Sequence, residues 1–168
     1  MTVIIVSSSV SSRTDKNKLS TDEWNEDINT ILEEISNVHV NPYHTTSKAD
    51  FEKYADELKI NLFSLSDNEV IARIAEMVAM IGDGHTVLDI SGFHNNNLNT
   101  SVFNFHAFPL QTYIFDKGVY VIYADKKNKE LEGKKLVKIN NTDIEIVLNK
   151  MKAIVPGDNE YNKKFSLP

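Results

Sequence analysis

The sequence contains no cysteine among its 168 residues. This absence excludes disulfide bonds within the chain, thiolate metal ligands and a cysteine nucleophile. No hydrophobic run approaches the roughly 20 residues that a membrane-spanning helix needs, so we expect no membrane span. The six glycines and four prolines are too few for a low-complexity or fibrous chain. These absences leave an ordinary globular protein as the class to consider.

The composition fits that class, because 41% of the residues are hydrophobic and 25% are charged. The charge is uneven along the chain. Residues 1–84 carry 15 acidic and 7 basic side chains, a balance of −8, whereas residues 85–168 carry 9 and 11, a balance of +2. Such an acidic first half argues against a surface that follows nucleic-acid phosphates, so no nucleic-acid partner is expected. The lysines of residues 126–138 are interpreted as the solvated edge of a hairpin.

The first 19 residues are predicted to be a flexible leader, and residues 20–85 a bundle of three helices. Ser20 or Thr21, Ser47 and Ser66 are the expected N-caps, and Gly82 is the expected C-terminal stop. Apolar residues at helical spacing predict one shared core. Its expected members are Trp24, Ile28, Leu32, Phe51, Leu58, Ile74 and Val78.

The hydrophobic period changes after Gly82. Runs rich in β-branched and aromatic residues predict strands at 86–90, 102–108, 110–115, 119–124 and 136–139, and helical spacing returns over 145–154. The fold class is therefore predicted to be α+β. A three-helix bundle over 20–85 is followed by a small β-rich module with one short helix over 86–168.

The strongest chemical signal is the run Gly82-Asp83-Gly84-His85-Thr86, between the third helix and the first strand. The glycines allow a sharp turn that presents His85 at an element boundary, where an imidazole can act as a general base. Asp83 is the candidate for orienting that imidazole. The alternative is a helix C-cap followed by a structural histidine.

Other chemistries have weaker signals. Asp83, His85, His94 and His106 could converge on zinc, but they show no recognised ligand spacing, so we expect no metal. Glycine-flanked serine elbows and phosphate-binding loops do not occur, and we assign no cofactor. His39 and His44 are expected to make local hydrogen bonds.

Three segments in order resemble a known family. They are His39-Val40-Asn41-Pro42-Tyr43, Leu65-Ser66-Asp67-Asn68-Glu69 and Ile81-Gly82-Asp83-Gly84-His85-Thr86. This order is similar to the N-terminal helical region of the C-terminal-processing (tail-specific) serine peptidases and their tricorn-core relatives. Residues 118–122 and 131–140 resemble the PDZ-like segment of that family. The resemblance covers roughly residues 20–160.

The resemblance implies proteolysis of a peptide or protein substrate, with the nucleophile in a C-terminal catalytic domain that would follow this chain. In the tricorn-like branch the helical domain supplies the base, and His85 matches that position. Gly84 departs from the branch, since it stands where a serine precedes the base. Another branch uses a serine–lysine dyad, in which the histidine need not be catalytic. On either pattern the 168-residue chain alone is expected to be inactive. Export from a bacterium is expected by family analogy only.

The PDZ-like resemblance also implies a binding mode. An extended peptide would add as a strand beside the helix at 145–154, with Ile146, Met151 or Ile154 as an apolar wall. The alternative function for the whole chain is a non-catalytic peptide-binding or structural module that keeps the family fold without its activity.

Overall fold

The computed structural model describes residues 2–5, 19–88, 109–157 and 159. These residues form two compact units, which are described separately. A helical unit contains residues 19–88 with 154–157 and 159, and a sheet unit contains residues 2–5 and 109–153. The chain is therefore α+β, as its sequence predicts.

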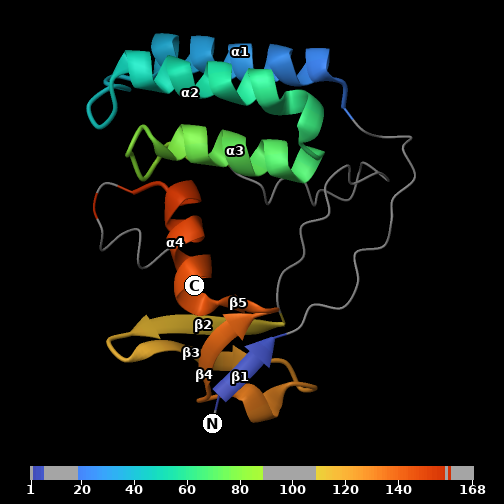
Figure 1. The fold of residues 1–168 in the computed structure, drawn as a ribbon. Coiled ribbons are helices and arrows are strands. Elements are labelled where there is room, and N and C mark those ends of the chain that lie inside the picture. Colours follow the sequence, from blue (N-terminus) through green and yellow to red (C-terminus); the bar gives the residue numbers. More distant parts are fainter. Residues whose placement is uncertain (1, 6–18, 89–108, 158, 160–168) are drawn as a thin grey trace. The chain divides into compact units, whose positions relative to one another are not determined.

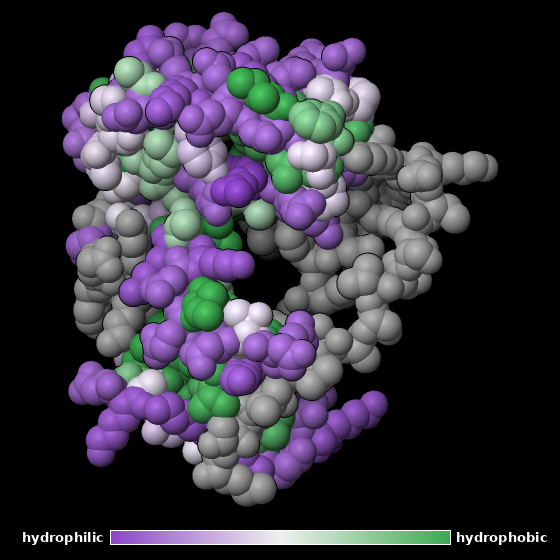
Figure 2. All heavy atoms as spheres, in the orientation of Figure 1, coloured by the Kyte–Doolittle hydropathy of each residue, from purple (hydrophilic) through white to green (hydrophobic). Residues whose placement is uncertain are grey.

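Three α-helices run alongside one another in the helical unit (Figure 1). They are α1 (Thr21–Val38), α2 (Lys48–Asn61) and α3 (Asp67–Ala79), and the short 3-10 helix η1 (Leu62–Ser64) ends α2. Helix α2 lies against both α1 and α3. On the face drawn in Figure 2, hydrophilic side chains cover most of these helices, as their acidic composition predicts.

Serine side chains begin all three helices. Ser20 and Ser66 each accept a hydrogen bond from the backbone N–H three residues later, and Glu23 and Glu69 complete the two capping boxes by accepting from the serine backbone. Ser47 accepts from the backbone N–H of Asp50. The predicted serine N-caps are confirmed, and the reciprocal bond that Glu23 accepts from the Ser20 backbone is an addition that the apolar pattern alone did not indicate.

The apolar faces of the three helices are buried, because their spacing of three and four residues places them on one side of each helix. The buried apolar side chains of the helical unit are Trp24, Ile28, Phe51, Ala55, Leu58, Leu62, Val70, Ile71, Ile74, Met77, Val78, Ala79 and Ile81. Leu32 was predicted to join them but is only half-buried. The later turns of α1, represented by Ile35 and Val38, border an open groove and are less covered.

The sheet unit has strand order β1-β4-β3-β2, with β5 also paired to β4. The strands are β1 (Thr2–Ile5), β2 (Leu110–Phe115), β3 (Gly118–Ala124), β4 (Lys135–Ile139) and β5 (Thr142–Asp143), with the 3-10 helix η3 (Lys129–Leu131) before β4. Strands β2, β3 and β4 pair in antiparallel fashion, whereas β1 lies parallel to β4. Strand β1 thus lies within the segment that the sequence predicts to be a leader.

Helix α4 (Ile144–Ile154) supplies the apolar partner of this sheet (Figure 1). Val119 and Leu136 are register partners on neighbouring strands, and both are buried with Ile144. The half-buried side chains packed around them are Ile114, Ile139, Val147 and Leu148. A small core of this kind follows from the alternation of side chains along strands and their helical spacing in α4.

The predicted strands agree with the structure in part. The hairpin β2–β3, strand β4 and helix α4 lie where the patterns predict them. Residues 86–88, however, have no regular structure, so the strand expected from Thr86 is wrong over that stretch. Thr86 donates its backbone N–H to the carbonyl of Asp83 and its hydroxyl to the Asp83 carboxylate, and such local bonds compete with strand pairing. The strand expected at 102–108 lies outside the described residues.

No helix in the described ranges is long and apolar enough to cross a membrane.

Candidate active site

The loop after α3 is organised around Asp83. Gly82 precedes it with a φ of +74°, a backbone conformation that residues with a side chain rarely adopt. One carboxylate oxygen of Asp83, Oδ1, accepts the backbone N–H of His85 at 2.8 Å. The other, Oδ2, accepts the Thr86 hydroxyl at 3.0 Å. The aspartate therefore holds the two residues that follow it in a closed turn.

A second histidine binds the same carboxylate. His39, the C-cap residue of α1, has its Nε2 3.0 Å from Oδ2 of Asp83. The backbone N–H of Asn41 donates to Nδ1 of His39 at 3.1 Å, so Nδ1 carries no proton in this arrangement. The imidazole proton is on Nε2 and is donated to Asp83. His39 is therefore a neutral donor that fastens the loop to the end of α1.

These bonds favour the ionised form of Asp83. The backbone N–H of His85 holds the pKa of the Asp83 carboxyl well below its usual range, and the donation from His39 acts in the same direction. Asp83 thus keeps its negative charge across the physiological pH range. A fixed negative charge beside an imidazole stabilises the protonated form of the histidine.

His85 is the imidazole available to solvent. Its side chain is 95% exposed, and its Nδ1 lies 3.5 Å from Oδ1 of Asp83. That distance is an ion-pair distance rather than a hydrogen bond of ordinary length. Asp83 therefore lies beside both histidines but makes its shorter imidazole contact with His39. The Asp83 and His85 side chains therefore lie beside each other across Gly84.

From the sequence, His39 was predicted to make only local hydrogen bonds. It does accept one local bond, from Asn41, but its second nitrogen reaches a residue 44 positions away. A pairing over that distance depends on how α1 and α3 pack, so the local pattern contains no signal for it. His44 makes the local contact expected of it, with Nδ1 2.9 Å from the carbonyl of Asn41.

An open groove of about 570 Å³ contains the aspartate and both histidines. It lies between the C-terminal end of α1 and the loop after α3, entirely within the helical unit. The side chains that line it are Glu34, Ile35, Val38, His39, Val40, Asp83, His85, Thr86 and Val87. It is large enough to hold one or two side chains of a ligand.

The groove has no serine nucleophile among the described residues. Each serine in that part of the chain has its hydroxyl in a local bond elsewhere. Ser20, Ser47 and Ser66 cap helices, Ser36 bonds Tyr43, and Ser64 donates to the carbonyl of Asn61. Nor do the described histidine and acidic residues include a group of three that could hold a metal ion. His94 and His106, which the zinc alternative invoked, lie outside the described residues.

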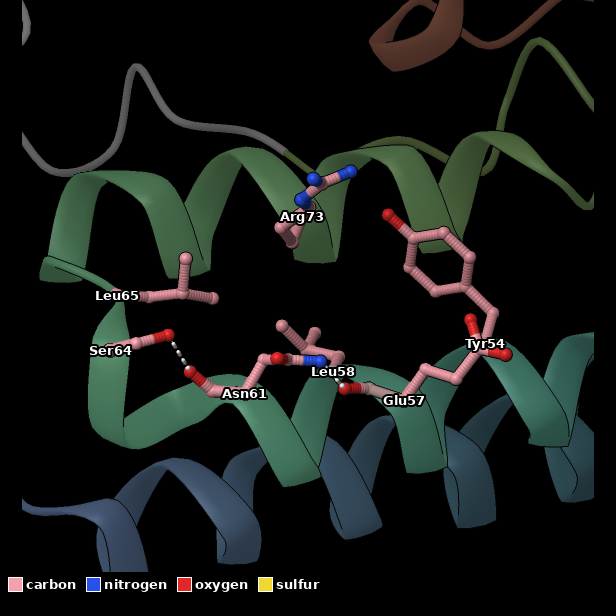
Figure 3. Close-up of a pocket in the computed structure, with 7 residues that line it drawn as sticks. All are labelled: Tyr54, Glu57, Leu58, Asn61, Ser64, Leu65 and Arg73. Carbon is pink, nitrogen blue, oxygen red and sulfur yellow. Dashed lines mark hydrogen bonds between the residues drawn. The ribbon is translucent and has the colours of Figure 1, made fainter.

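A second pocket, of about 300 Å³, lies between α2 and α3 (Figure 3). Leu58 and Leu65 form its apolar part, and the side chain of Tyr54 borders it. The Tyr54 hydroxyl donates to Oε2 of Glu76 at 2.5 Å, and Arg73 donates to the same oxygen at 2.7 Å. Burial and this bond to Glu76 raise the pKa of Tyr54 to about 12. At neutral pH the tyrosine is therefore a hydrogen-bond donor and not a base.

Of the residues proposed for peptide binding, Ile146 and Met151 lie in the sheet unit and Ile154 lies in the helical unit. Ile146 is 52% exposed, whereas Met151 and Ile154 are half-buried. Ile146 and Met151 are five residues apart on α4, which corresponds to about 140° around a helix. Ile146 and Met151 therefore lie on different sides of α4.

The opposite side of the hairpin carries a chain of aromatic rings. The ring of Phe115 lies 4.7 Å from that of Tyr113 and 5.7 Å from that of Tyr120. Tyr113 and Phe115 are 44% and 47% exposed. An open depression of about 820 Å³ adjoins Phe115 and Tyr120, next to Lys117. The rings of Tyr113 and Phe115 thus form an exposed apolar surface on the sheet unit.

No known protein family, curated protein or solved structure matches the chain. The functional assignment therefore depends on the residues and geometry described above.

Proposed function

We propose that the chain is the N-terminal, non-nucleophilic portion of a serine peptidase of the tail-specific type, and that His85 is its general base. The observation that supports this most is the position of His85 beside Asp83. A general base must present one nitrogen to the substrate while a neighbouring group stabilises the imidazolium that forms. The exposed imidazole and the Nδ1-to-carboxylate distance of 3.5 Å are compatible with both requirements.

In the proposed mechanism the proton of a serine hydroxyl moves to Nε2 of His85, across the ring from Asp83. The serine oxygen then attacks the peptide carbonyl, and His85 returns the proton to the leaving amine. Asp83 stays ionised throughout, because the bonds from His85 and His39 lower its pKa. His39 is a positioning residue, since it acts through Asp83 and not on the substrate.

The nucleophile must come from a serine other than those described, because the described serines have their hydroxyls in local bonds. We therefore expect that residues 1–168 alone cleave no peptide bond and are not labelled by a serine-directed fluorophosphonate. The complete protein should be labelled and active.

The test is His85→Ala in the complete protein, with His44→Ala as the matched control. His85→Ala should lower turnover by about two to four orders of magnitude, the usual contribution of a general base. His44 is exposed and bonds only the Asn41 carbonyl among the described contacts, so its removal should leave turnover unchanged. Normal specific activity in the folded His85→Ala protein would end the proposal. A lower melting temperature with unchanged turnover per folded molecule would assign His85 a structural role.

A non-catalytic binding module is the second candidate, and the exposed rings of Tyr113 and Phe115 favour it. The PDZ-like interpretation of the sheet unit is supported by the hairpin β2–β3 and by the packing of Ile144 in α4 against Val119 and Leu136. Among the described strands β2 has a free edge, to which a peptide could add. Labelled peptides with apolar C-termini should then bind saturably and shift the amide signals of α4. Unchanged α4 signals at saturating peptide would remove this second candidate.

A further inference from the structure

The exposed aliphatic side chains beside His85 are unusually concentrated. Val40 is fully exposed, at 101%, and Val38 and Val87 are 73% and 52% exposed. All three line the groove that contains His85, and Ile35 lies half-buried beside them. They come from two segments, the end of α1 and the loop after α3. Exposed aliphatic side chains that gather around one groove mark a surface that a ligand covers.

The charged groups of the same groove have one sign. Glu34 and Asp83 are acidic, and no lysine or arginine lines the groove. His39 is neutral, because its Nδ1 accepts a hydrogen bond from the backbone N–H of Asn41 and only its Nε2 carries a proton, which is shared in a hydrogen bond with Asp83. Asp83 is already bonded to three groups, whereas no described contact involves the Glu34 carboxylate. Glu34 is therefore the acidic group of the groove that can pair with a ligand.

We infer that this groove is the substrate subsite next to His85, and that it binds an aliphatic side chain flanked by a cationic residue of an extended peptide. The aliphatic side chain lies among Val38, Val40 and Val87, and the cation pairs with Glu34. The acidic lining disfavours a carboxylate at this position, including the free C-terminus of a peptide. The inference depends on the proposed function for its role in catalysis, but the binding itself requires no nucleophile.

The test measures binding to the 168-residue chain by amide chemical shifts. Three capped peptides of equal length serve as probes, with the central residues lysine–leucine–lysine, lysine–serine–lysine and glutamate–leucine–glutamate. The first should bind and shift the signals of residues 34–40 and 83–87. The serine peptide has the same charge, so it reports non-specific attraction to the acidic unit, and it should bind about tenfold more weakly. The glutamate peptide should show no saturable binding.

Two pairs of variants locate the site. Val40→Ser should weaken the first peptide about tenfold, whereas Ile60→Ser, a substitution at a 70% exposed aliphatic residue outside the groove, should leave binding unchanged. Glu34→Gln should reduce the preference for lysine over glutamate, whereas Glu33→Gln should not, because Glu33 does not line the groove. These side chains are exposed or at the helix surface, so the variants should fold like the parent chain.

Several results would overturn the inference. Equal binding of the leucine and serine peptides would show that the aliphatic side chains do not contribute. Unchanged binding in both Val40→Ser and Glu34→Gln would place the peptide elsewhere. A dimer of the chain that Val40→Ser dissociates would show that a second copy covers the groove. The proposed function can fail independently of this inference. If His85→Ala left turnover unchanged, the proposed function would be wrong, but the 168-residue chain would still bind the peptide.

Discussion

His39 and Asp83 are 44 residues apart in the sequence, and the His39 imidazole donates a hydrogen bond of 3.0 Å to the Asp83 carboxylate. The contact joins the C-terminal end of α1 to the loop that follows α3. Because the Asn41 N–H occupies Nδ1 of His39, the imidazole can give Asp83 only the proton on Nε2. The position of His85 therefore depends on a histidine that neither binds substrate in the proposed mechanism nor exchanges a proton with it.

The first prediction concerns that contact. His39→Ala should lower the free energy of unfolding of the helical unit by about 1–2 kcal/mol, because it removes a donor to a carboxylate. Trp24, the only tryptophan and buried in this unit, reports the unfolding by its fluorescence. His44→Ala should have a smaller effect, since that side chain makes one local bond to a backbone carbonyl. If both variants unfolded at the same denaturant concentration, the contact between His39 and Asp83 would contribute no more to the free energy of unfolding than the local bond of His44.

A second prediction uses the acid titration of Asp83. The bonds from His85 and His39 lower its folded-state pKa below the unfolded value, so the folded state binds this proton less readily than the unfolded chain. The stabilisation from Asp83 is therefore complete above the unfolded pKa of about 4 and is lost as pH falls from there through the folded pKa. Asp83→Asn should unfold more readily than the parent at pH 7, and the difference should shrink as pH falls below about 4. A difference that stayed constant from neutral to acid pH would contradict the role of the ionised carboxylate.

A third prediction compares two glycines with the same backbone angle. Gly82 and Gly133 both have a φ of +74°, but a Cβ at Gly82 would lie within 2.4 Å of the Thr45 hydroxyl, whereas one at Gly133 would meet nothing within 4 Å. Gly133→Ala should cost about 1 kcal/mol from backbone strain alone. Gly82→Ala should cost more, because the Thr45 side chain must also move.

Thr45→Ala measures the second part of that cost. In its background the Gly82→Ala penalty should decrease, because the hydroxyl and methyl groups of Thr45 are gone. Chemical unfolding of the single and double variants gives the coupling between the two positions. An equal penalty at Gly82 in both backgrounds would show that the hydroxyl and methyl groups of Thr45 do not contribute to it.

The success of sequence reasoning depended on how local each feature is. The caps at Ser47 and Ser66 and the burial of Trp24 and Ile28 follow from spacing over a few residues, and the structure confirms them. The strand expected at Thr86 is wrong because the Asp83 carboxylate and carbonyl hold that residue in a turn. Strand propensity over five residues does not contain the competing hydrogen bonds of a neighbouring aspartate.

The candidate site was likewise predictable only in its local part. The glycine-rich run indicated Asp83 and His85, since both the sharp turn and the histidine are visible in five consecutive residues. The part played by His39 depends on the packing of α1 against the rest of the helical unit, which no local pattern specifies. The groove beside His85 was missed for a similar reason. Val40 and Val87 belong to segments with no amphipathic period, and only the folded chain brings them to one surface.

The last prediction concerns Tyr54, on the pocket between α2 and α3. Burial, followed by the hydrogen bond to Glu76, raises its pKa from the usual value near 10 to about 12. Between these two values the unfolded chain releases the phenol proton while the folded chain retains it. The stabilisation from Tyr54 is therefore complete below about pH 10 and is lost as pH rises through its folded pKa of about 12.

Two substitutions separate the causes of this shift. Tyr54→Phe should remove the phenolate absorbance that titrates near pH 12 and should flatten the alkaline part of the unfolding curve. Glu76→Gln keeps a hydrogen-bond acceptor but removes the negative charge, so the Tyr54 midpoint should fall toward its usual value while burial maintains part of the shift. Arg73 loses its carboxylate partner in the same variant, which makes a nearby positive charge more available to the phenolate and moves the midpoint in the same direction. A Tyr54 midpoint unchanged by Glu76→Gln would show that the negative charge of Glu76 does not contribute to the raised pKa.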